Sequence, residues 1–530
     1  MVINKIISLN FRKFFTWPRT IVLGLPVFLI IYQGLNHHTN QNDIIYLLKI
    51  LPELIKNTGL LLICVVIFSS FWGLFFSITL SLTNLPGRYI LKKLLFLPLA
   101  LPLYVSSFIF IGATDYGSGL NIFCREYFNI NIDLITRELG SVWIGFIFSL
   151  YLSPYLSIAM TKAMDSIGVN QWPVAKTMGL SNFEVVKKIL LPGVSPWFFA
   201  SMMIISMEVL SDFGGVSAFN YDTLSTGIYT AWTGLFNYGL ALKISLILII
   251  FSVTLFSFEK KIKGKKSFQV KGRSHMSHPP IHLSKLKSFT LYIPIVFYFI
   301  LSIIAPASYL ISWTFLSDEM SLNKLVPLTL NTIYLGIGLA STCSIGSYIY
   351  TYISKDNGDY FKKYIRPFEL MGYSLPGPII AISFISIFTF LNRIFGLSIN
   401  LSGIFVLTIA IFYRFLFIGE RNWSSAFERV NNSAINTAKV LGLGYLSRFK
   451  LTYYPVLKVN IVPIFSLLFL EVIKELPITL MLRPFGLNTL SINIYELTSE
   501  GEWERAASSA LVLLLLGAPI VLITNLRSRK

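Results

Sequence analysis

The sequence predicts an all-α membrane protein of about twelve transmembrane helices, arranged as two repeated halves of six helices. Hydrophobic residues make up 54% of the 530 residues and charged residues only 13%. Apolar runs of about 20 residues, the length that crosses a bilayer as a helix, recur along the whole chain. Motifs of the first half return in the second half at nearly constant spacing, which indicates an internal repeat.

The net charge of +19 is explained by the membrane and not by nucleic acid. In a soluble chain such a charge would indicate a nucleic-acid partner. Here the basic residues stand in short loops between apolar runs, as the positive-inside rule predicts. The expected surroundings are therefore a lipid bilayer, with no nucleic acid. The cysteines Cys64, Cys124 and Cys343 have no spacing typical of a disulfide framework or a metal site.

Twelve apolar runs are the candidate spans. The first follows basic residues and has no small-residue cleavage site after it, so it is expected to be a retained span and not a removed signal peptide. In the first half the runs are 20–36, 58–83, 96–113, 139–162, 198–213 and 237–257. In the second half they are 291–315, 327–353, 370–391, 401–418, 461–476 and 507–526.

Loop charges predict the orientation of the spans. The loops expected in the cytoplasm are rich in lysine and arginine, as around Lys92 and around Lys362 and Lys363. The loop 114–138 carries several carboxylates and is expected outside. Both termini are then cytoplasmic, in a multi-pass protein of the bacterial inner membrane.

A basic segment separates the two halves. Residues 259–288 are rich in lysine and contain His275, His278 and His282. Histidines can bind metals, but Pro279-Pro280 prevents a helix from aligning these three, and no carboxylate is near. A flexible cytoplasmic linker is the better interpretation. The predicted domains are 1–258 and 291–530, with the linker at 259–290.

The stretch 169–197 is the longest amphipathic interruption of the first half. Pro173 suits the first turn of a helix, and Gly179 suits the left-handed turn that ends one. Ser181 and Glu184 have the spacing of a capping box, which predicts a second helix that stops at Pro192. The expected unit is a helix, a glycine turn, a second helix and a proline stop, between two spans.

The same unit returns in the stretch 432–460, at an offset of 263 residues. An ordinary amphipathic surface helix would explain one such stretch, but not two at a fixed offset. Without a gap, Ala175 matches Ala438, Gly179 matches Gly442 and Pro192 matches Pro455.

Both stretches resemble the EAA loop of ABC importer permeases. That pattern is Glu-Ala-Ala, three residues, Gly, nine residues and Ile-x-Leu-Pro. The spacing from Gly179 to Ile189, Leu191 and Pro192 fits it. The glutamate is absent, since Pro173 and Asn436 stand in its place, and the second copy has Thr452 and Tyr454 instead of Ile and Leu. The resemblance implies that both loops dock onto an ATPase and that the two docking sites differ in strength.

Nearly the whole chain resembles iron(III)-type permeases with two fused domains. The stretches that carry this likeness are SDFGGVSAFNYDTLSTGIYTAWTGL and KELPITLMLRPFGLNTLSINIYEL. The resemblance implies the MetI-like fold of type I importers, two ATPase copies, a periplasmic iron-binding protein and alternating access. Thiamine, phosphonate and polyamine permeases are relatives, so these substrates stay as alternatives.

The motifs of nucleotide hydrolysis are missing. Gly264-Lys265 lacks the upstream glycine of a Walker A sequence. No catalytic set or zinc signature is present either, so the chain is not expected to be an enzyme or to bind a cofactor. ATP and Mg are expected to be used by the partner ATPase. A secondary transporter coupled to ions is the alternative of another class, but it would have no use for two docking loops.

Four carboxylates stand near the ends of two predicted spans. Glu208 and Asp212 are four residues apart, so they share a helix face, and Glu471 and Glu475 repeat them. Ionisable residues in a span usually face a cavity or a partner. These carboxylates are therefore either candidates for the translocation path of a hard cation or parts of helix ends, with Lys474 neutralising a glutamate and Asp212 capping a turn. No metal ligand set is assigned.

Two further pairs of motifs support the repeat. Asn57-Thr58 returns as Asn331-Thr332. Thr223-Leu-Ser with Ile228-Tyr229 returns as Thr489-Leu-Ser with Ile494-Tyr495. The sequence therefore predicts a built-in pseudo-dimer with one path between its halves.

Overall fold

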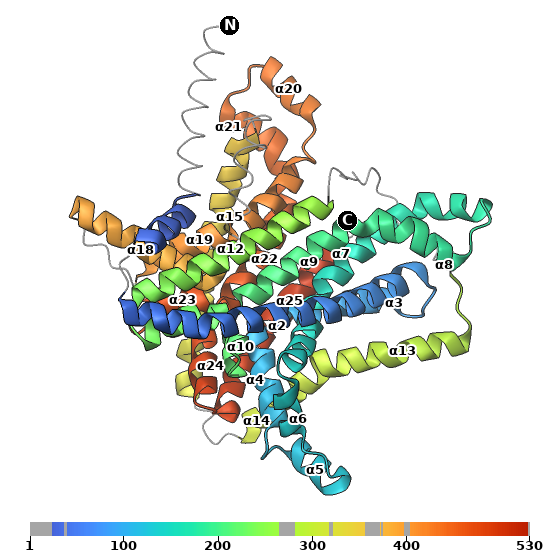
Figure 1. The fold of residues 1–530 in the computed structure, drawn as a ribbon. Coiled ribbons are helices and arrows are strands. Elements are labelled where there is room, and N and C mark those ends of the chain that lie inside the picture. The colour runs from blue at the N-terminus through green and yellow to red at the C-terminus, as the bar shows by residue number, and fades with distance from the viewer. Residues whose placement is uncertain are drawn as a thin grey trace. The chain divides into compact units, whose positions relative to one another are not determined.

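The computed structural model describes residues 24–36, 40–263, 281–316, 322–355, 372, 375–396 and 403–527. In these ranges every regular element is a helix, apart from a single bridge between Thr83 and Ile281 (Figure 1). The prediction of an all-α membrane protein is confirmed. The basic loop around Lys362 and Lys363, and the histidines His275 and His278, lie outside the described residues.

The described residues form two compact units whose limits differ from those of the sequence repeats. One unit contains the described parts of 1–38, 326–492 and 526–530. The other contains those of 39–325 and 493–525. The domain division 1–258, 259–290 and 291–530 follows from the repeat and stays a prediction.

The first half consists of helices of very different lengths. After the helix Gly24–Asn36, its elements are α2 (Gln41–Leu82), α3 (Arg88–Leu94), η1 (Leu97–Ala100), α4 (Leu103–Thr114), α5 (Gly119–Phe128), α6 (Ile132–Leu139), α7 (Ser141–Thr177), α8 (Asn182–Val185), η2 (Val186–Leu190), α9 (Leu191–Ser211), α10 (Gly214–Ala218), α11 (Leu224–Tyr229), η3 (Thr230–Gly234) and α12 (Tyr238–Lys263).

The second half repeats much of this order. Its elements are α13 (Lys285–Phe299), η4 (Ile300–Ile304), α14 (Ala305–Leu316), α15 (Leu322–Lys355), α18 (Gly377–Phe395), α19 (Ile404–Phe427), α20 (Asn432–Val440), α21 (Tyr445–Arg448), η5 (Phe449–Tyr453), α22 (Tyr454–Lys474), α23 (Pro477–Leu482), α24 (Leu490–Ser499) and α25 (Trp503–Arg527).

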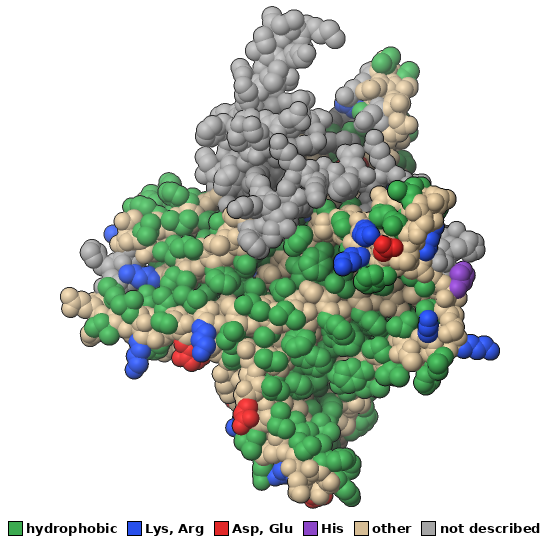
Figure 2. Space-filling view, turned by 45° about the vertical axis from the view of Figure 1, so that its right-hand side comes forward, with side chains coloured by type: hydrophobic (Ala, Val, Ile, Leu, Met, Phe, Trp, Pro, Cys, Tyr) green, Lys and Arg blue, Asp and Glu red, His purple; other side chains and the backbone are tan. Residues whose placement is uncertain are grey.

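Nine helices of the described residues are long and apolar enough to cross a membrane, and a bent pair of helices would make a tenth. Each predicted span corresponds to a helix or a pair of helices, although the count of twelve is not established. Figure 2 shows hydrophobic side chains over much of the visible face, with few charged ones among them. This distribution is expected for a surface that contacts lipid.

The predicted span 96–113 is a bent pair and not one straight helix. Arg88–Ala100 and Leu103–Phe128 meet at an angle of 86°. Pro102 forces the residue before it into an extended conformation, and Leu101 has φ −90° and ψ 125°. The second half has a proline at the matching position, because Pro376 stands immediately before α18.

The first span of the second half packs against helices of the first half. The hydroxyl of Tyr298 on α13 donates to the carbonyl of Leu150 over 2.6 Å. Its ring lies 4.7 Å from that of Phe76 and 5.1 Å from that of Trp72. α13 thus packs against α2 and α7, which explains why the compact units differ from the sequence repeats.

The predicted linker is largely structured at both of its ends. Residues 259–263 continue α12, and α13 begins at Lys285. Between them, the N–H of Ile281 donates to the carbonyl of Leu82, and the N–H of Asn84 donates to the carbonyl of Ile281. A lysine-rich composition indicated a solvated chain, but backbone pairing and the apolar side chain of Ile281 fix this end of the segment. Residues 264–280 lie outside the described residues.

Candidate functional site

The first amphipathic loop turns at Gly179 in the way the sequence predicts. Gly179 has φ +78°, a conformation that other residues rarely adopt. The N–H of Leu180 donates to the carbonyl of Ala175, and that of Gly179 donates to the carbonyl of Lys176. These two bonds are the Schellman motif that ends a helix.

The second helix of this loop begins with the predicted capping box. The backbone N–H of Glu184 donates to the hydroxyl of Ser181 over 3.3 Å, and the N–H of Ser181 donates to the carboxylate of Glu184 over 3.0 Å. Lys188 forms an ion pair with Glu184 at 2.8 Å. The turn between the two helices is therefore fixed by both backbone and side-chain bonds.

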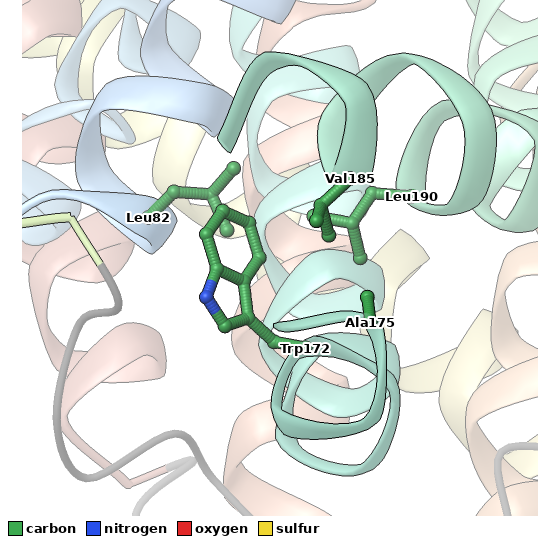
Figure 3. Close-up of a cluster of buried hydrophobic side chains, with 5 residues drawn as sticks. All are labelled: Leu82, Trp172, Ala175, Val185 and Leu190. Atoms are coloured by element: carbon green, nitrogen blue, oxygen red, sulfur yellow. The ribbon is translucent and has the colours of Figure 1, made fainter. Parts of the chain in front are cut away.

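A small apolar core holds the two helices of the loop together. Ala175 is buried there beside Trp172, Val185 and Leu190, and Leu82 at the end of α2 completes the cluster (Figure 3). Ile281, from the segment between the halves, packs against its edge. The loop is thus a packed subdomain attached to α2.

The outer side of this loop exposes apolar and basic side chains. Met178 and Phe183 are each 73% exposed, and Val174 is exposed as well. Lys187 and Lys188 are exposed too, and the ammonium of Lys187 lies 5.9 Å from the ring centroid of Phe183. Large exposed apolar side chains grouped at one site are typical of a surface that binds another protein.

Two details of the predicted unit are wrong. The short helix expected from Val174 to Met178 is not a separate element, because α7 runs from Ser141 through Pro173 to Thr177. The second helix does not stop at Pro192, because α8, η2 and α9 follow each other without a break from Asn182 to Ser211. At η2 the N–H of Leu191 donates to the carbonyl of Val186, five residues back. This π turn is wider than an α turn and accommodates the proline, which cannot donate a hydrogen bond.

The second loop repeats the backbone turn of the first but not its capping box. Gly442 has φ +67°, and the N–H of Leu443 donates to the carbonyl of the buried Ala438. A π turn, η5, again precedes the proline, here Pro455. Gly444 stands at the position of Ser181, so this loop has no capping box.

The exposed surface of the second loop is also apolar. Val440 is 88% exposed and Leu441 69%. Pro192 and Pro455 are both exposed, whereas Ile189 and Leu191 of the first loop are partly buried. The proline of the motif therefore lies on the outer side of each loop.

The structure gives Asp212 and Glu475 equivalent roles at helix starts. A carboxylate oxygen of Asp212 accepts from the N–H of Val216 over 3.0 Å. Glu475 accepts from the N–H groups of Ile478 and Thr479, both over 2.9 Å, and from the hydroxyl of Thr479 over 2.8 Å. Both carboxylates thus bind the start of the next helix, as the helix-end interpretation predicted for Asp212, and a role of either in a translocation path stays a prediction.

The other two carboxylates lie in the last turns of α9 and α22. Lys474 forms an ion pair with Glu471 at 3.4 Å, as the sequence indicated. Glu208, on α9, is partly exposed. The residue of the first half that matches Lys474 is the uncharged Ser211. A role of Glu208 and Glu471 in a translocation path stays a prediction.

The repeated Asn-Thr pairs anchor the helices that follow these carboxylates. The hydroxyl of Thr58 on α2 accepts from the N–H of Leu224, and the amide of Asn57 donates to the carbonyl of Asp222. In the second half, Thr332 accepts from Leu490, and Asn331 donates to Asn488. The sequence showed the repeat of these pairs, but not their role.

Comparison with known proteins agrees with this geometry. Residues 344–529 match the family described as "Binding-protein-dependent transport system inner membrane component". The match covers the second amphipathic loop and both carboxylates of the second half, where contacts of the first half are repeated.

Curated relatives of this chain are transport proteins. It is 26% identical over 485 residues to the Fe(3+)-transport system permease protein FbpB 2 of Haemophilus influenzae, covering 89% of this chain and 90% of that protein. It is 24% identical over 152 residues to the sulfate transport system permease protein CysT of Salmonella typhimurium, covering 28% of this chain and 52% of that one.

A shorter likeness connects the chain to a third protein. It is 25% identical over 154 residues to the molybdenum transport system permease protein ModB of Escherichia coli K12, covering 29% of this chain and 65% of that protein. No solved structure matches the chain. The likeness to FbpB 2 extends over both halves, whereas the other two likenesses are partial.

Proposed function

We propose that this chain is the membrane-spanning permease subunit of an ATP-driven importer that carries ferric iron from a periplasmic binding protein into the cytoplasm. The observation that carries the proposal is the pair of loops at 169–197 and 432–460. Both have a left-handed glycine, a buried alanine and a π turn before an exposed proline.

Each loop presents a preformed surface for an ATPase subunit. The exposed Met178 and Phe183 of the first loop, and Val440 and Leu441 of the second, are apolar anchors of the kind that dominate protein interfaces. Two such loops call for two ATPase copies, one for each loop. In this proposal the ATPase subunits bind ATP and Mg and hydrolyse the nucleotide, while the permease itself holds no cofactor.

The coupling follows from the rigidity of the loops. In the first loop, the helix that contains Phe183 continues without a break into α9. A displacement of the docked surface is therefore transmitted along one helix toward Glu208 and Asp212. In the second loop, η5 continues into α22 and toward Glu471 in the same way.

Iron is proposed as the substrate because the likeness that covers both halves is to an iron permease. Both termini are placed in the cytoplasm, in a multi-pass protein of the inner membrane, because the basic loops are on the side of the amphipathic loops. The alternatives are thiamine, phosphonate and polyamines, and the partial relatives add sulfate and molybdenum oxyanions to the substrates to be tested.

Uptake of radioactive iron in a strain that lacks this gene tests the proposal. Loss of ferric iron uptake, restored by the gene on a plasmid, is the expected result. Competition by excess unlabelled thiamine, phosphonate, polyamine, sulfate or molybdate should leave iron uptake unchanged. Normal iron uptake in the deletion strain together with loss of one of these other substrates would replace iron by that substrate.

A further inference from the structure

Two tyrosines at equivalent positions of the two repeats lie against each other. Tyr229 and Tyr495 are matched by the repeat, and their ring centroids are 6.2 Å apart at an interplanar angle of 85°. Phe213 completes the cluster, with centroids 4.2 Å from Tyr229 and 5.2 Å from Tyr495. All three residues belong to the same compact unit.

This contact locates the axis of the internal repeat. Two residues that a two-fold operation exchanges can touch each other only close to its axis. Repeats with the same orientation in the membrane are related by an axis along the membrane normal. A path between two such repeats runs along that axis, so the tyrosine pair lies on it. This step rests on the proposed function, which supplies the path.

Both tyrosines are held by the same construction. Tyr229 lies five residues after Leu224, whose N–H is bound by Thr58. Tyr495 lies five residues after Leu490, whose N–H is bound by Thr332. The Asn-Thr pair of each repeat thus holds the start of the short helix that carries the tyrosine of that repeat.

The third ring is held by the carboxylate next to it. Phe213 follows Asp212, which caps α10 through the N–H of Val216. Phe213 is 2% exposed, whereas the two tyrosines are only partly buried. The repeat has Leu476 at the position of Phe213, so the cluster contains three rings instead of four.

The tyrosine rings pack edge to face and Phe213 is tilted against both, so the three rings in contact leave no room for an ion between them. We propose that Tyr229, Tyr495 and Phe213 form the closed gate of the translocation path, and that the two tyrosine rings must separate for the substrate to pass.

A reversible cross-link between the two tyrosine positions tests the gate. The parent carries Cys64→Ala, Cys124→Ser and Cys343→Ala, with a protease site inserted in 264–280. Tyr229→Cys and Tyr495→Cys are then added together. Oxidation of the full-length protein in cells should join the two fragments that the protease releases. It should also reduce iron uptake to background, and a reductant should restore both the separation and the uptake.

Three controls make the result specific. Either cysteine alone, and the displaced pair Thr230→Cys with Tyr495→Cys, should give little cross-link and normal uptake. Tyr229→Phe with Tyr495→Phe keeps the rings and should keep uptake. Fragments that separate after oxidation, or a cross-linked protein that transports at the rate of the parent, would overturn the gate. Absence of iron uptake with the unmodified protein would instead contradict the proposed function.

Discussion

The hydroxyl of Thr332 accepts a hydrogen bond from the backbone N–H of Leu490 over 2.8 Å, and it donates to the carbonyl of Leu328 in its own helix over 2.8 Å. Thr58 makes the same two bonds, with Leu224 over 3.0 Å and Leu54 over 2.7 Å. One threonine in each repeat thus ties a long helix to the short helix that carries a gate tyrosine.

Thr332→Val should lower the stability of the protein. Valine has nearly the same shape, but it leaves the buried N–H of Leu490 without an acceptor, which costs about 1–3 kcal/mol. The expected result is a lower midpoint of thermal unfolding of the purified protein in detergent. Thr332→Ser keeps the hydroxyl and should stay close to the wild type. Equal midpoints for the valine and wild-type proteins would show that the bond contributes little.

Gly179→Asp should abolish iron uptake while the protein still inserts into the membrane. The left-handed conformation costs about 1–2 kcal/mol for a residue with a β-carbon, and the new charge lies on the docking surface. Among the described residues, apart from the two chain neighbours, no atom lies within 4 Å of an added β-carbon at Gly179 or Gly442, so steric overlap with them does not contribute. Gly442→Asp should reduce uptake less, because the motif around it is degenerate.

Uptake and co-purification of the ATPase, both normalised to the amount of permease in the membrane, check this asymmetry. Gly179→Asp should lose both, and Gly442→Asp should retain part of both. Equal loss of uptake in the two variants with normal ATPase binding would contradict it.

Ser181→Ala should loosen the first docking helix. The variant loses the hydrogen bond from the N–H of Glu184, and loss of a cap costs about 0.5–2 kcal/mol. Faster amide hydrogen exchange in 182–190 is the expected result. Gly444→Ser is the matched change in the second loop and should slow exchange slightly in 445–453. Unchanged exchange in Ser181→Ala would mean that packing on Trp172, and not the cap, holds the helix.

Glu208→Gln should lower iron uptake more than Glu471→Gln. Lys474 already neutralises Glu471, whereas the equivalent position beside Glu208 is the uncharged Ser211. ATPase activity stimulated by the binding protein should persist in both variants, because the docking loops are unchanged. Normal uptake in both variants would show that the carboxylates of Glu208 and Glu471 are not needed for transport and have a structural role.

Epitope tags should establish the orientation of the chain. A tag after Asn129, in the exposed turn between α5 and α6, should be accessible from outside only. Tags in 264–280 and after Lys530 should be accessible from the cytoplasm only. Asn121 is not a suitable position, because its buried amide donates to Thr114, Asp115 and Asn131 and accepts from Ile132. A linker tag accessible from outside would reverse the predicted orientation of both docking loops.

Hydropathy predicted where the spans lie, because a bilayer requires long apolar helices whatever their packing. It did not predict their true lengths. α2 begins at Gln41, well before the apolar run at 58, and passes through Pro52. Helical hydrogen bonds continue into polar sequence, and a hydropathy average cannot detect that continuation.

The candidate site was predictable where local chemistry decides the backbone. Gly179, Gly442 and the capping box at Ser181 follow from φ preference and side-chain spacing, and all are confirmed. The helix through Pro192 was not predictable, because the π turn before it has no periodic signature. The repeat matched Tyr229 with Tyr495, but their contact depends on tertiary packing, which spacing in the sequence does not contain.

The π turns at η2 and η5 determine which side of the following helices, α9 and α22, faces a given direction. A π turn contains one residue more than an α turn, and an α-helix rotates by about 100° for each residue. The extra residue therefore sets the rotational phase of everything downstream, including the sides of α9 and α22 on which Glu208 and Glu471 stand. Both π turns stand at matching positions of the repeat. The number of residues from the glycine to the proline therefore fixes the rotation of the following helix about its axis as well as its distance from the loop.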